Sequence, residues 1–457
     1  RNGRVEYTGI IVPRSVIATI GTTEYYKVSK FCNDVVEVTG DEVTVTLHSD
    51  IEYDLYLMRN TADIIFDLNG HILTGTINCW NKTLLVKDSS TGKSGKVIGG
   101  VEMGSDELLT VDGITIESEN YQPIYVSSGK VILNNVTASS KNNKAIEFAG
   151  EEMTINGGTY TSQQYSALYV NGSSAKVTIN GGTFTSGGTY SGSIEITNAK
   201  SINISNATVT GSIGIKDNSS SAALYIKDCT VNATTSALYL RGGGQTTITG
   251  GTYTSEGSDY YDAALYGECA SITINSGTFT NENQYGLFLR NDGTKKVING
   301  GTFTGKQAGA MLENGECTIN NGTFTGETYG LRASRCNSVT VNEATFTANV
   351  GLFVEGSSVT LNGGVFNGQA NAITLKSWNN VPEIIFGEGK VFKTADNTIL
   401  DAITEDVAGS GRVVDANATS IDRINADKAG KAIKTVENGK VVIIRDGDKY
   451  DLAGRKL

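Results

Sequence analysis

The segment Thr178-Ile-Asn-Gly-Gly-Thr-Phe-Thr185 recurs with small changes along the middle of this 457-residue chain. Close copies begin at Thr154, Thr273 and Thr318. When the Ile position of each copy is used as a marker, the markers run from Ile155 to Leu361 at a mean spacing of about 23 residues. A repeat of this length is typical of solenoids, in which each repeat packs mainly on its two neighbours.

Each repeat predicts three short strands. Apolar and polar residues alternate on both sides of the Asn-Gly-Gly step, as at Val177 and Ile179 before it and Phe184 after it. A period of two residues predicts strand, bend and strand. A further alternating run, such as Ala167-Leu-Tyr-Val170, precedes each copy. Three strands in each coil of about 23 residues predict an all-β fold, the parallel β-helix.

Stacked coils place equivalent residues above one another at about 4.8 Å, so the repeat predicts columns of like side chains. An inward apolar and aromatic column is expected at Tyr160, Phe184, Val209, Val231, Tyr253, Phe279, Phe303, Phe324, Phe346 and Phe366. An amide column is expected at the bend, where Asn tolerates left-handed backbone angles. Its members are Asn156, Asn180, Asn275, Asn299, Asn320, Asn342 and Asn362.

Both ends of a solenoid need caps, because the terminal coils expose unpaired strand edges. Near the N-terminus, helical spacing relates Val28, Phe31, Cys32, Val35 and Val36. An amphipathic helix over about residues 24–37 is therefore expected to cover the first coil. We divide the chain into N-terminal strands with a helical cap (residues 1–60), a parallel β-helix (61–400) and a small C-terminal β module (401–457).

The run Asp63-Ile-Ile-Phe-Asp-Leu-Asn-Gly-His-Ile-Leu-Thr-Gly75 and the repeated Ile-Asn-Gly-Gly-Thr-Phe resemble the pectate-lyase-like right-handed β-helix surface proteins of gut bacteria, of the Bacteroidetes type. The resemblance covers roughly residues 20–400 and implies a single-stranded right-handed β-helix. It does not specify an activity, because this fold includes lyases, hydrolases, adhesins and phage tailspikes. Segments between Ser420 and Leu457 resemble short C-terminal modules of secreted Bacteroidetes proteins, which are associated with sorting or surface attachment.

Charge and hydropathy restrict the partners. A formal net charge of −11 and a pI near 4.9 disfavour nucleic acid and anionic membrane surfaces, and equally disfavour a polyanionic glycan unless calcium intervenes. No run of eighteen apolar residues is present, so we expect no membrane insertion. The chain begins without a signal peptide, which favours a mature form that is secreted or lies on the outer cell surface. We expect a monomer.

The cysteines suggest neither a metal site nor a disulfide framework. They lie at positions 32, 79, 229, 269, 317 and 336, without metal-ligand spacing. Cys269 and Cys336 share a phase in the repeat, but other coils lie between them, so no disulfide is expected. We interpret all six as small buried apolar residues. No metal and no cofactor are predicted.

The variable third strand offers the candidate ligand-binding residues. Its outward positions form a row that includes Tyr169, Gly214, Tyr239, Tyr266, Phe288 and Met311. Flat apolar faces in a row can stack on sugar rings. The longest interval between markers holds the insertion at residues 255–262, so Asp259, Tyr260, Tyr261 and Asp262 are expected to rim the row.

We predict that these residues, Gly214 excepted, contact a ligand. The alternatives are that a loop packs over the row, or that aromatic pairing between coils simply suits a sheet. One position further along the strand, Arg241, Glu268, Arg290 and Glu313 alternate in sign, which favours ion pairing between coils over a catalytic cluster.

Evidence for catalysis is sparse. Only five aspartates lie between Lys141 and Lys376, and both histidines precede the regular repeats, so a lyase or polygalacturonase has little support. One weak catalytic alternative is the pair Glu147 and Glu195, two coils or roughly 10 Å apart with Tyr169 between them. That separation approaches the upper end used by inverting glycosidases.

The sequence therefore favours a non-catalytic, adhesin-like protein that contacts a glycan or another component of a host or bacterial surface. A polysaccharide-active enzyme, either a glycoside hydrolase or a lyase, and a purely structural surface spacer remain as alternatives. The third strand should decide among the three.

Overall fold

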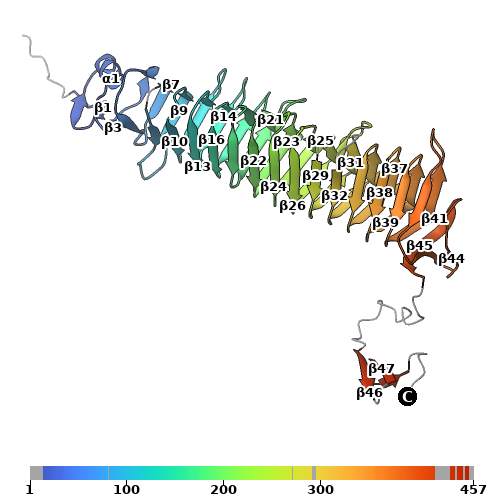
Figure 1. Ribbon diagram of the computed structural model, residues 1–457. Coiled ribbons are helices and arrows are strands. Elements are labelled where there is room, and N and C mark those ends of the chain that lie inside the picture. The colour runs from blue at the N-terminus through green and yellow to red at the C-terminus, as the bar shows by residue number, and fades with distance from the viewer. Residues whose placement is uncertain are drawn as a thin grey trace, which may run out of the picture.

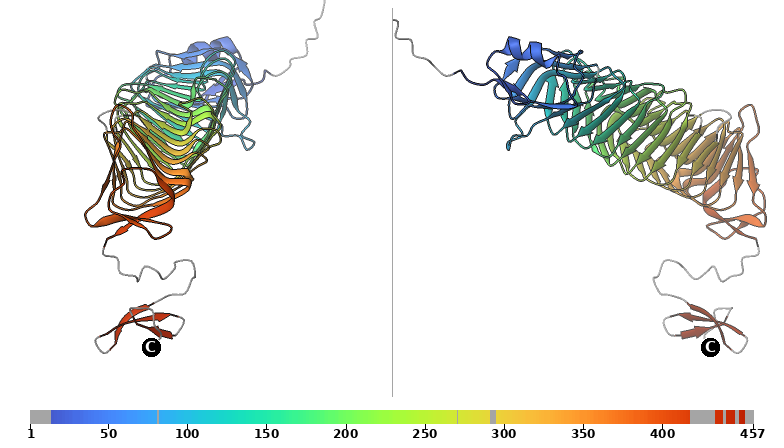
Figure 2. Two further views of the ribbon diagram at one scale, coloured as in Figure 1. Left: turned by 90° about the vertical axis from the view of Figure 1, so that its right-hand side faces the viewer. Right: turned by 60° about the vertical axis from the view of Figure 1, so that its left-hand side comes forward.

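The chain forms one long stack of β coils (Figure 1). The structure is a computed structural model that describes residues 14–80, 82–269, 271–290, 295–416, 433–437, 440–445 and 448–451. Seen nearly along the stack, the coils superimpose on one another (Figure 2, left). The predicted right-handed parallel β-helix with three strands per coil is confirmed.

The first face of the stack is formed by the strand that carries the repeated Ile. Its strands pair in parallel from one coil to the next. They are β3 (Glu42–Leu47), β6 (Asp63–Asp67), β8 (Leu84–Lys87), β10 (Leu108–Asp112), β13 (Lys130–Asn134), β16 (Glu152–Asn156), β19 (Lys176–Ile179), β22 (Ser201–Ser205), β24 (Ala223–Lys227), β26 (Gln245–Thr249), β29 (Ser271–Ile274), β32 (Lys295–Ile298), β35 (Glu316–Ile319), β38 (Ser338–Val341), β40 (Ser358–Leu361) and β42 (Glu383–Phe386).

The second face follows the Gly-Gly bend. Its separate strands are β4 (Ile51–Glu52), β11 (Thr115–Ser118), β14 (Thr137–Ser140), β17 (Thr159–Ser162), β20 (Gly182–Ser186), β27 (Thr252–Ser255), β30 (Thr278–Asn281), β33 (Thr302–Gly305) and β36 (Thr323–Gly326). Two outward rows on this face are almost entirely threonine. Charged and aromatic side chains vary on the third face instead.

The third face completes each coil. Its separate strands are β5 (Leu55–Leu57), β12 (Ile124–Val126), β15 (Ile146–Phe148), β18 (Leu168–Asn171), β21 (Gly192–Asn198), β28 (Ala263–Gly267), β31 (Tyr285–Arg290), β34 (Ala308–Glu313) and β37 (Tyr329–Ser334). In several coils a single long strand runs through both the second and third faces. These are β7 (Ile72–Cys79), β9 (Lys96–Met103), β23 (Ala207–Asp217), β25 (Thr230–Leu240), β39 (Thr345–Glu355) and β41 (Val365–Lys376).

The predicted aromatic column is present and fully buried. From Tyr253 to Phe366 the rings stack in an unbroken series, with centroids 4.7–5.2 Å apart and interplanar angles of 8–19°. Tyr160 and Phe184 form a second stacked pair at 5.0 Å. Offset stacking adds to the apolar area that each ring buries, so the column holds each coil in one register on the next.

The predicted amide column is confirmed as well. Each Asn side chain donates from Nδ2 to the equivalent Asn or Thr one coil earlier, at 2.7–3.0 Å. The expectation about left-handed angles was wrong for these residues. Positive φ falls on the residues that follow them, such as Gly157 and Gly277, and on Asn135 and Asn206 at equivalent places.

The glycine that precedes the aromatic strand has a second constraint. Gly277 has φ of +137°, and a Cβ added there would lie 3.0 Å from the Phe279 ring. Gly301 and Gly322 show the same close approach to Phe303 and Phe324. The repeated Gly therefore permits the turn and also makes room for the aromatic column.

The N-terminal cap matches the prediction but is shorter. Helix α1 (Val28–Val35) buries Phe31, Cys32 and Val35 against the first coil. Strand β1 (Ala18–Ile20) covers the edge of β3 in antiparallel pairing, and β2 (Thr23–Tyr25) pairs with β1. Parallel pairing already begins between β3 and β6, so the β-helix starts before the predicted boundary at residue 61.

The C-terminal end is closed by antiparallel strands. Strand β45 (Val407–Asp415) pairs with β41 and with β43 (Lys390–Thr394), and β43 pairs with β44 (Ile399–Leu400). Residues 401–415 thus belong to the cap of the β-helix rather than to a C-terminal module. Strands β46 (Ile433–Glu437), β47 (Lys440–Arg445) and β48 (Asp448–Tyr450) form a separate antiparallel sheet. Residues 420–424, which belong to the segments that resemble a C-terminal sorting module, lie outside the described residues.

The interpretation of the cysteines as small buried residues is confirmed, because all six are buried. Burial raises the pKa of Cys317 and Cys336 to about 12, so neither is a thiolate near neutral pH. Among the described residues, no helix is long and apolar enough to span a membrane.

Removing one ring from the aromatic column should destabilise the stack. Phe303→Ala leaves a cavity between Phe279 and Phe324, and we expect the free energy of unfolding to fall by about 3–5 kcal/mol. Urea unfolding followed by circular dichroism measures the change. The exposed control Thr302→Ala should stay within about 0.5 kcal/mol of wild type. Equal losses in both variants would contradict a stabilising role for the column.

Candidate functional site on the third face

The predicted outward row exists as a set of directly paired residues. Strand β25 contributes Tyr239, which pairs with Tyr266 of β28. Tyr266 pairs with Phe288 of β31, and Phe288 pairs with Met311 of β34. The alternating pattern of the third strand therefore predicted correctly that these four residues share one row.

The row is not an open platform. Tyr266, Phe288 and Met311 are only 3%, 0% and 0% exposed, and they form a hydrophobic cluster with Ala263, Tyr285 and Ala308. Tyr239 is partly exposed and stacks on Tyr266 at 5.0 Å. We predicted that Tyr266, Phe288 and Met311 offer a surface on which sugar rings stack directly. Their burial contradicts this prediction. The alternative, in which a loop packs over the row, describes the structure.

Tyr260 and Tyr261 of the insertion provide that cover. The Tyr261 ring stacks on Phe288 at 5.9 Å, and the Tyr260 ring meets Phe288 edge to face at 5.7 Å. The two tyrosines also contact each other edge to face at 5.1 Å. Both tyrosines remain 45% exposed, so the insertion presents the most accessible aromatic surface over this part of the row.

Hydrogen bonds fix the insertion in place. Asp262 accepts from the Asp259 amide at 2.9 Å, and burial raises the pKa of the Asp262 carboxyl. Asn283 and Gln284, on the next coil, donate their side-chain amides to Glu256 O and Ser258 O. Asp262 therefore has a clear role in shaping the loop that presents the two tyrosines.

The predicted ion pairing between coils is confirmed. Arg241 pairs with Glu268 at 2.9 Å, and Arg290 pairs with Glu313 at 3.5 Å. Tyr266 Oη donates to the Glu268 carboxylate at 3.1 Å, which connects the pairs to the buried row. The Arg290 guanidinium lies over the Tyr261 ring and donates to Tyr261 Oη at 3.3 Å.

The network extends further than the sequence indicated. Glu313 also pairs with Arg335, which occupies a left-handed turn after β37. Glu355 accepts from Arg332 at 2.8 Å and pairs with Lys376 at 3.1 Å. Sequence reasoning missed Arg335 because it lies outside the strand alternation. It also missed the exposed Trp378 near this network, although the chain has only two tryptophans.

The weak catalytic pair is engaged in other contacts. Glu147 pairs with Lys144 at 3.0 Å and accepts from Gln122 at 2.6 Å. Glu195 pairs with Lys216 at 3.1 Å and accepts from Ser166 Oγ at 2.9 Å. Two carboxylates neutralised in this way are not arranged as a free acid and a free base.

The register near this pair also corrects the predicted row. Lys216, and not Gly214, pairs with Glu195 on one side and with Tyr239 on the other. The merged strand β23 contains a register shift between Gly211 and Ile213, which displaces the alternation. Tyr169 remains in the row, and Lys144 Nζ lies 3.9 Å from its ring centroid.

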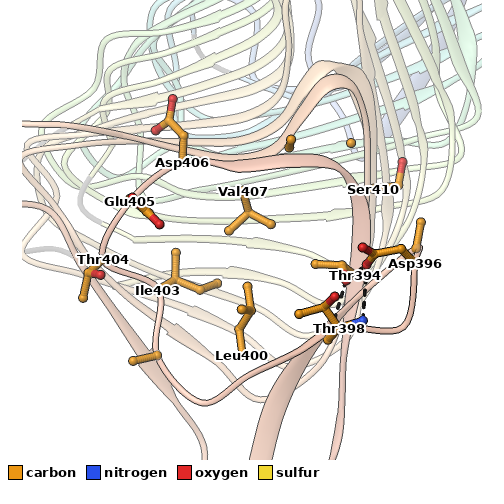
Figure 3. A pocket seen from close by; sticks show the side chains of 14 residues that line it. Thr394, Asp396, Thr398, Leu400, Ile403, Thr404, Glu405, Asp406, Val407 and Ser410 are labelled. Carbon is orange, nitrogen blue, oxygen red and sulfur yellow. Dashed lines mark hydrogen bonds between the residues drawn. The ribbon is translucent and has the colours of Figure 1, made fainter.

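A cavity lies elsewhere, in the C-terminal cap. It has a volume of about 550 Å³ and is lined by cap residues that include Leu400, Ile403 and Val407 (Figure 3). Asp406, at its edge, accepts from the Leu375 amide at 2.8 Å and so secures the cap. None of the predicted site residues lines it. Within the described part of the chain, no cluster of three or more His, Cys, Asp or Glu residues could hold a metal ion.

Comparison with known proteins supports the fold over the region that contains the third-face site. A family model described as a right handed beta helix region matches residues 211–388. Searches of curated proteins and of solved structures found no match. The match supports a β-helix family and does not distinguish an adhesin from an enzyme.

Acid should weaken the third-face network at Glu355. Burial raises the pKa of this carboxyl, but hydrogen bonds from Arg332, Lys376 and Ser334 outweigh burial and hold the pKa below its usual range. A lowered folded-state pKa gives stability that is complete above the unfolded value of about 4.3 and is lost as pH falls below it. Glu355→Gln should therefore lower the free energy of unfolding at pH 7 by roughly 1.5–3 kcal/mol and make its decline in acid shallower.

Urea unfolding at a series of pH values tests this expectation. The control is Glu327→Gln, because Glu327 is exposed. It should retain the acid sensitivity of the wild type. Parallel loss of stability in wild type and Glu355→Gln on acidification would show that Glu355 does not contribute it.

Proposed function

We propose that this protein is a non-catalytic, adhesin-like β-helix that acts outside the cell, either secreted or on the outer surface, and contacts carbohydrate through Tyr260 and Tyr261. The observation that supports the proposal best is that Tyr260 and Tyr261 are about half exposed and pack on the buried hydrophobic cluster around Phe288. A Bacteroidetes origin and a pectate-lyase-like relationship stay predictions from the sequence.

The geometry suits recognition of a sugar ring. The two tyrosines present apolar faces with a polar hydroxyl at the edge, the combination that suits a pyranose. Because contacts with Phe288 and the next coil already fix the insertion, little conformational entropy remains to be lost on binding. Arg290 and Glu268 supply a donor and an acceptor nearby.

The alternatives differ in their support. A structural spacer is favoured by the burial of Tyr266, Phe288 and Met311, which gives the aromatic row a stabilising role without any ligand. An enzyme has less support, because Glu147 and Glu195 are both held in ion pairs. A monomer that contacts a glycan or a host or bacterial surface component is the proposed state of the protein.

The experiment is a glycan array probed with wild type and with the double variant Tyr260→Ala/Tyr261→Ala. We expect the double variant to lose about tenfold or more in apparent affinity, since two aromatic contacts are removed. The matched control is Tyr190→Ala, whose ring is the most exposed of the large apolar side chains in the described residues at 85%. The control should bind like wild type.

Three outcomes separate the hypotheses. Binding lost only in the double variant supports the proposed site. Binding that persists in the double variant places the ligand elsewhere on the protein. Absence of binding to any glycan, with normal circular dichroism, leaves the spacer as the better description.

A further inference from the structure

A second aromatic surface lies toward the C-terminal end of the third face, around Trp378. The Trp378 side chain is 52% exposed, and Gly356 packs beneath it, since a Cβ on Gly356 would lie 3.2 Å from Trp378 Cβ. The Arg335 guanidinium lies 5.9 Å from the Trp378 ring centroid. We refer to Arg335, Lys376 and Trp378 as the tryptophan patch.

Backbone hydrogen bonds define where these residues sit. The Arg335 amide donates to Glu355 O at 2.8 Å, and the Gly356 amide donates to Lys376 O at 3.0 Å. The turns that hold Arg335, Gly356 and Trp378 therefore follow one another on successive coils. Two cations and the indole ring thus converge at one corner of the stack.

The charges around the patch are unequal. Two glutamates, Glu313 and Glu355, are only 5% and 3% exposed. Glu313 is shared by Arg290 and Arg335, while Glu355 is shared by Arg332 and Lys376. These ion pairs contain four cations and two carboxylates, and Asp406, which accepts from the Leu375 amide, adds one more carboxylate near Lys376, so a surplus of positive charge remains.

The surplus faces solvent. The carboxylates lie beneath the surface, whereas the Arg335 and Lys376 side chains are 42% and 56% exposed. This arrangement is unusual in a chain whose net charge is −11. An accessible arginine and lysine beside an apolar ring form a binding environment for an anion attached to a flat apolar body.

We propose that the tryptophan patch binds an anionic sugar residue, with its carboxylate or sulfate group at Arg335 and Lys376 and its ring against Trp378. This inference rests on the proposed function and adds the charge of the ligand to it. Net charge disfavours a polyanionic glycan for the protein as a whole, as the sequence indicated. The local charge at this corner has the opposite sign, so it accepts a single anionic residue without calcium.

Tryptophan fluorescence tests the proposal directly, because the chain has only two tryptophans, Trp80 and Trp378. The titrants are a hyaluronan tetrasaccharide, which carries carboxylates, a chondroitin sulfate tetrasaccharide, which adds sulfate, and neutral chitotetraose. We expect the anionic sugars to change the emission of wild type and of Trp80→Phe, and not that of Trp378→Phe. Trp80 is 42% exposed and therefore makes a matched control.

A charge variant provides the second arm. Arg335→Ala/Lys376→Ala should weaken binding of the anionic sugars about tenfold or more and reduce its dependence on salt. Circular dichroism confirms that each variant is folded. A preference for chondroitin sulfate over hyaluronan identifies sulfate as the recognised group, and equal binding identifies the carboxylate.

The outcomes also distinguish this inference from the proposed function. If anionic and neutral sugars bind equally and Trp378→Phe responds like wild type, the inference is wrong. When that binding is also lost in Tyr260→Ala/Tyr261→Ala, the proposed function still stands. If none of the sugars binds and the glycan array is also blank, both are wrong.

Discussion

Parallel pairing of each residue with its equivalent one coil later is the constraint on which this structure depends. Because each coil pairs with the next in the same register, equivalent residues of successive coils lie on top of one another. The stacked rings from Tyr253 to Phe366 are an example. The amide hydrogen bonds at the bend repeat the same register at the surface. A shift of one residue would break both columns at once.

This constraint determines where function can evolve. The first and second faces are occupied by the repeated sequence, which supplies the core, the bend and two outward rows of threonine. The third face lies outside the repeated sequence. Its residues can therefore vary without loss of the aromatic and amide columns. That face holds the buried hydrophobic cluster around Phe288, the ion pairs between coils, and the insertion that carries Tyr260 and Tyr261. The tryptophan patch continues the same face towards the C-terminal cap.

Most of the fold could be predicted from the sequence because its determinants recur in every coil, at a mean spacing of about 23 residues. Ring stacking, amide pairing and the pairing of Tyr239 with Tyr266 follow from that recurrence, whereas the N-terminal helix follows from the helical period of its apolar residues. The burial of Phe288 could not, since it depends on how one insertion folds back over the strands. Lys216 was misplaced because a register shift within β23 is invisible to alternation. Trp378 and Arg335 lie in the turns that follow third-face strands, which the repeated sequence does not specify.

A deletion of one whole coil tests the central claim most directly. The register pairs Thr159 with Thr183, so removing residues 159–182 joins Gly158 to Thr183 in phase. Circular dichroism and urea unfolding of this variant should show a folded, cooperative β protein whose stability is close to that of wild type. Removing residues 155–177 instead joins Thr154 to Thr178 inside a first-face strand, which shifts the alternation of that strand by one residue and should strongly destabilise the stack. Equal stability of the two deletions would contradict an account in which register holds the molecule together.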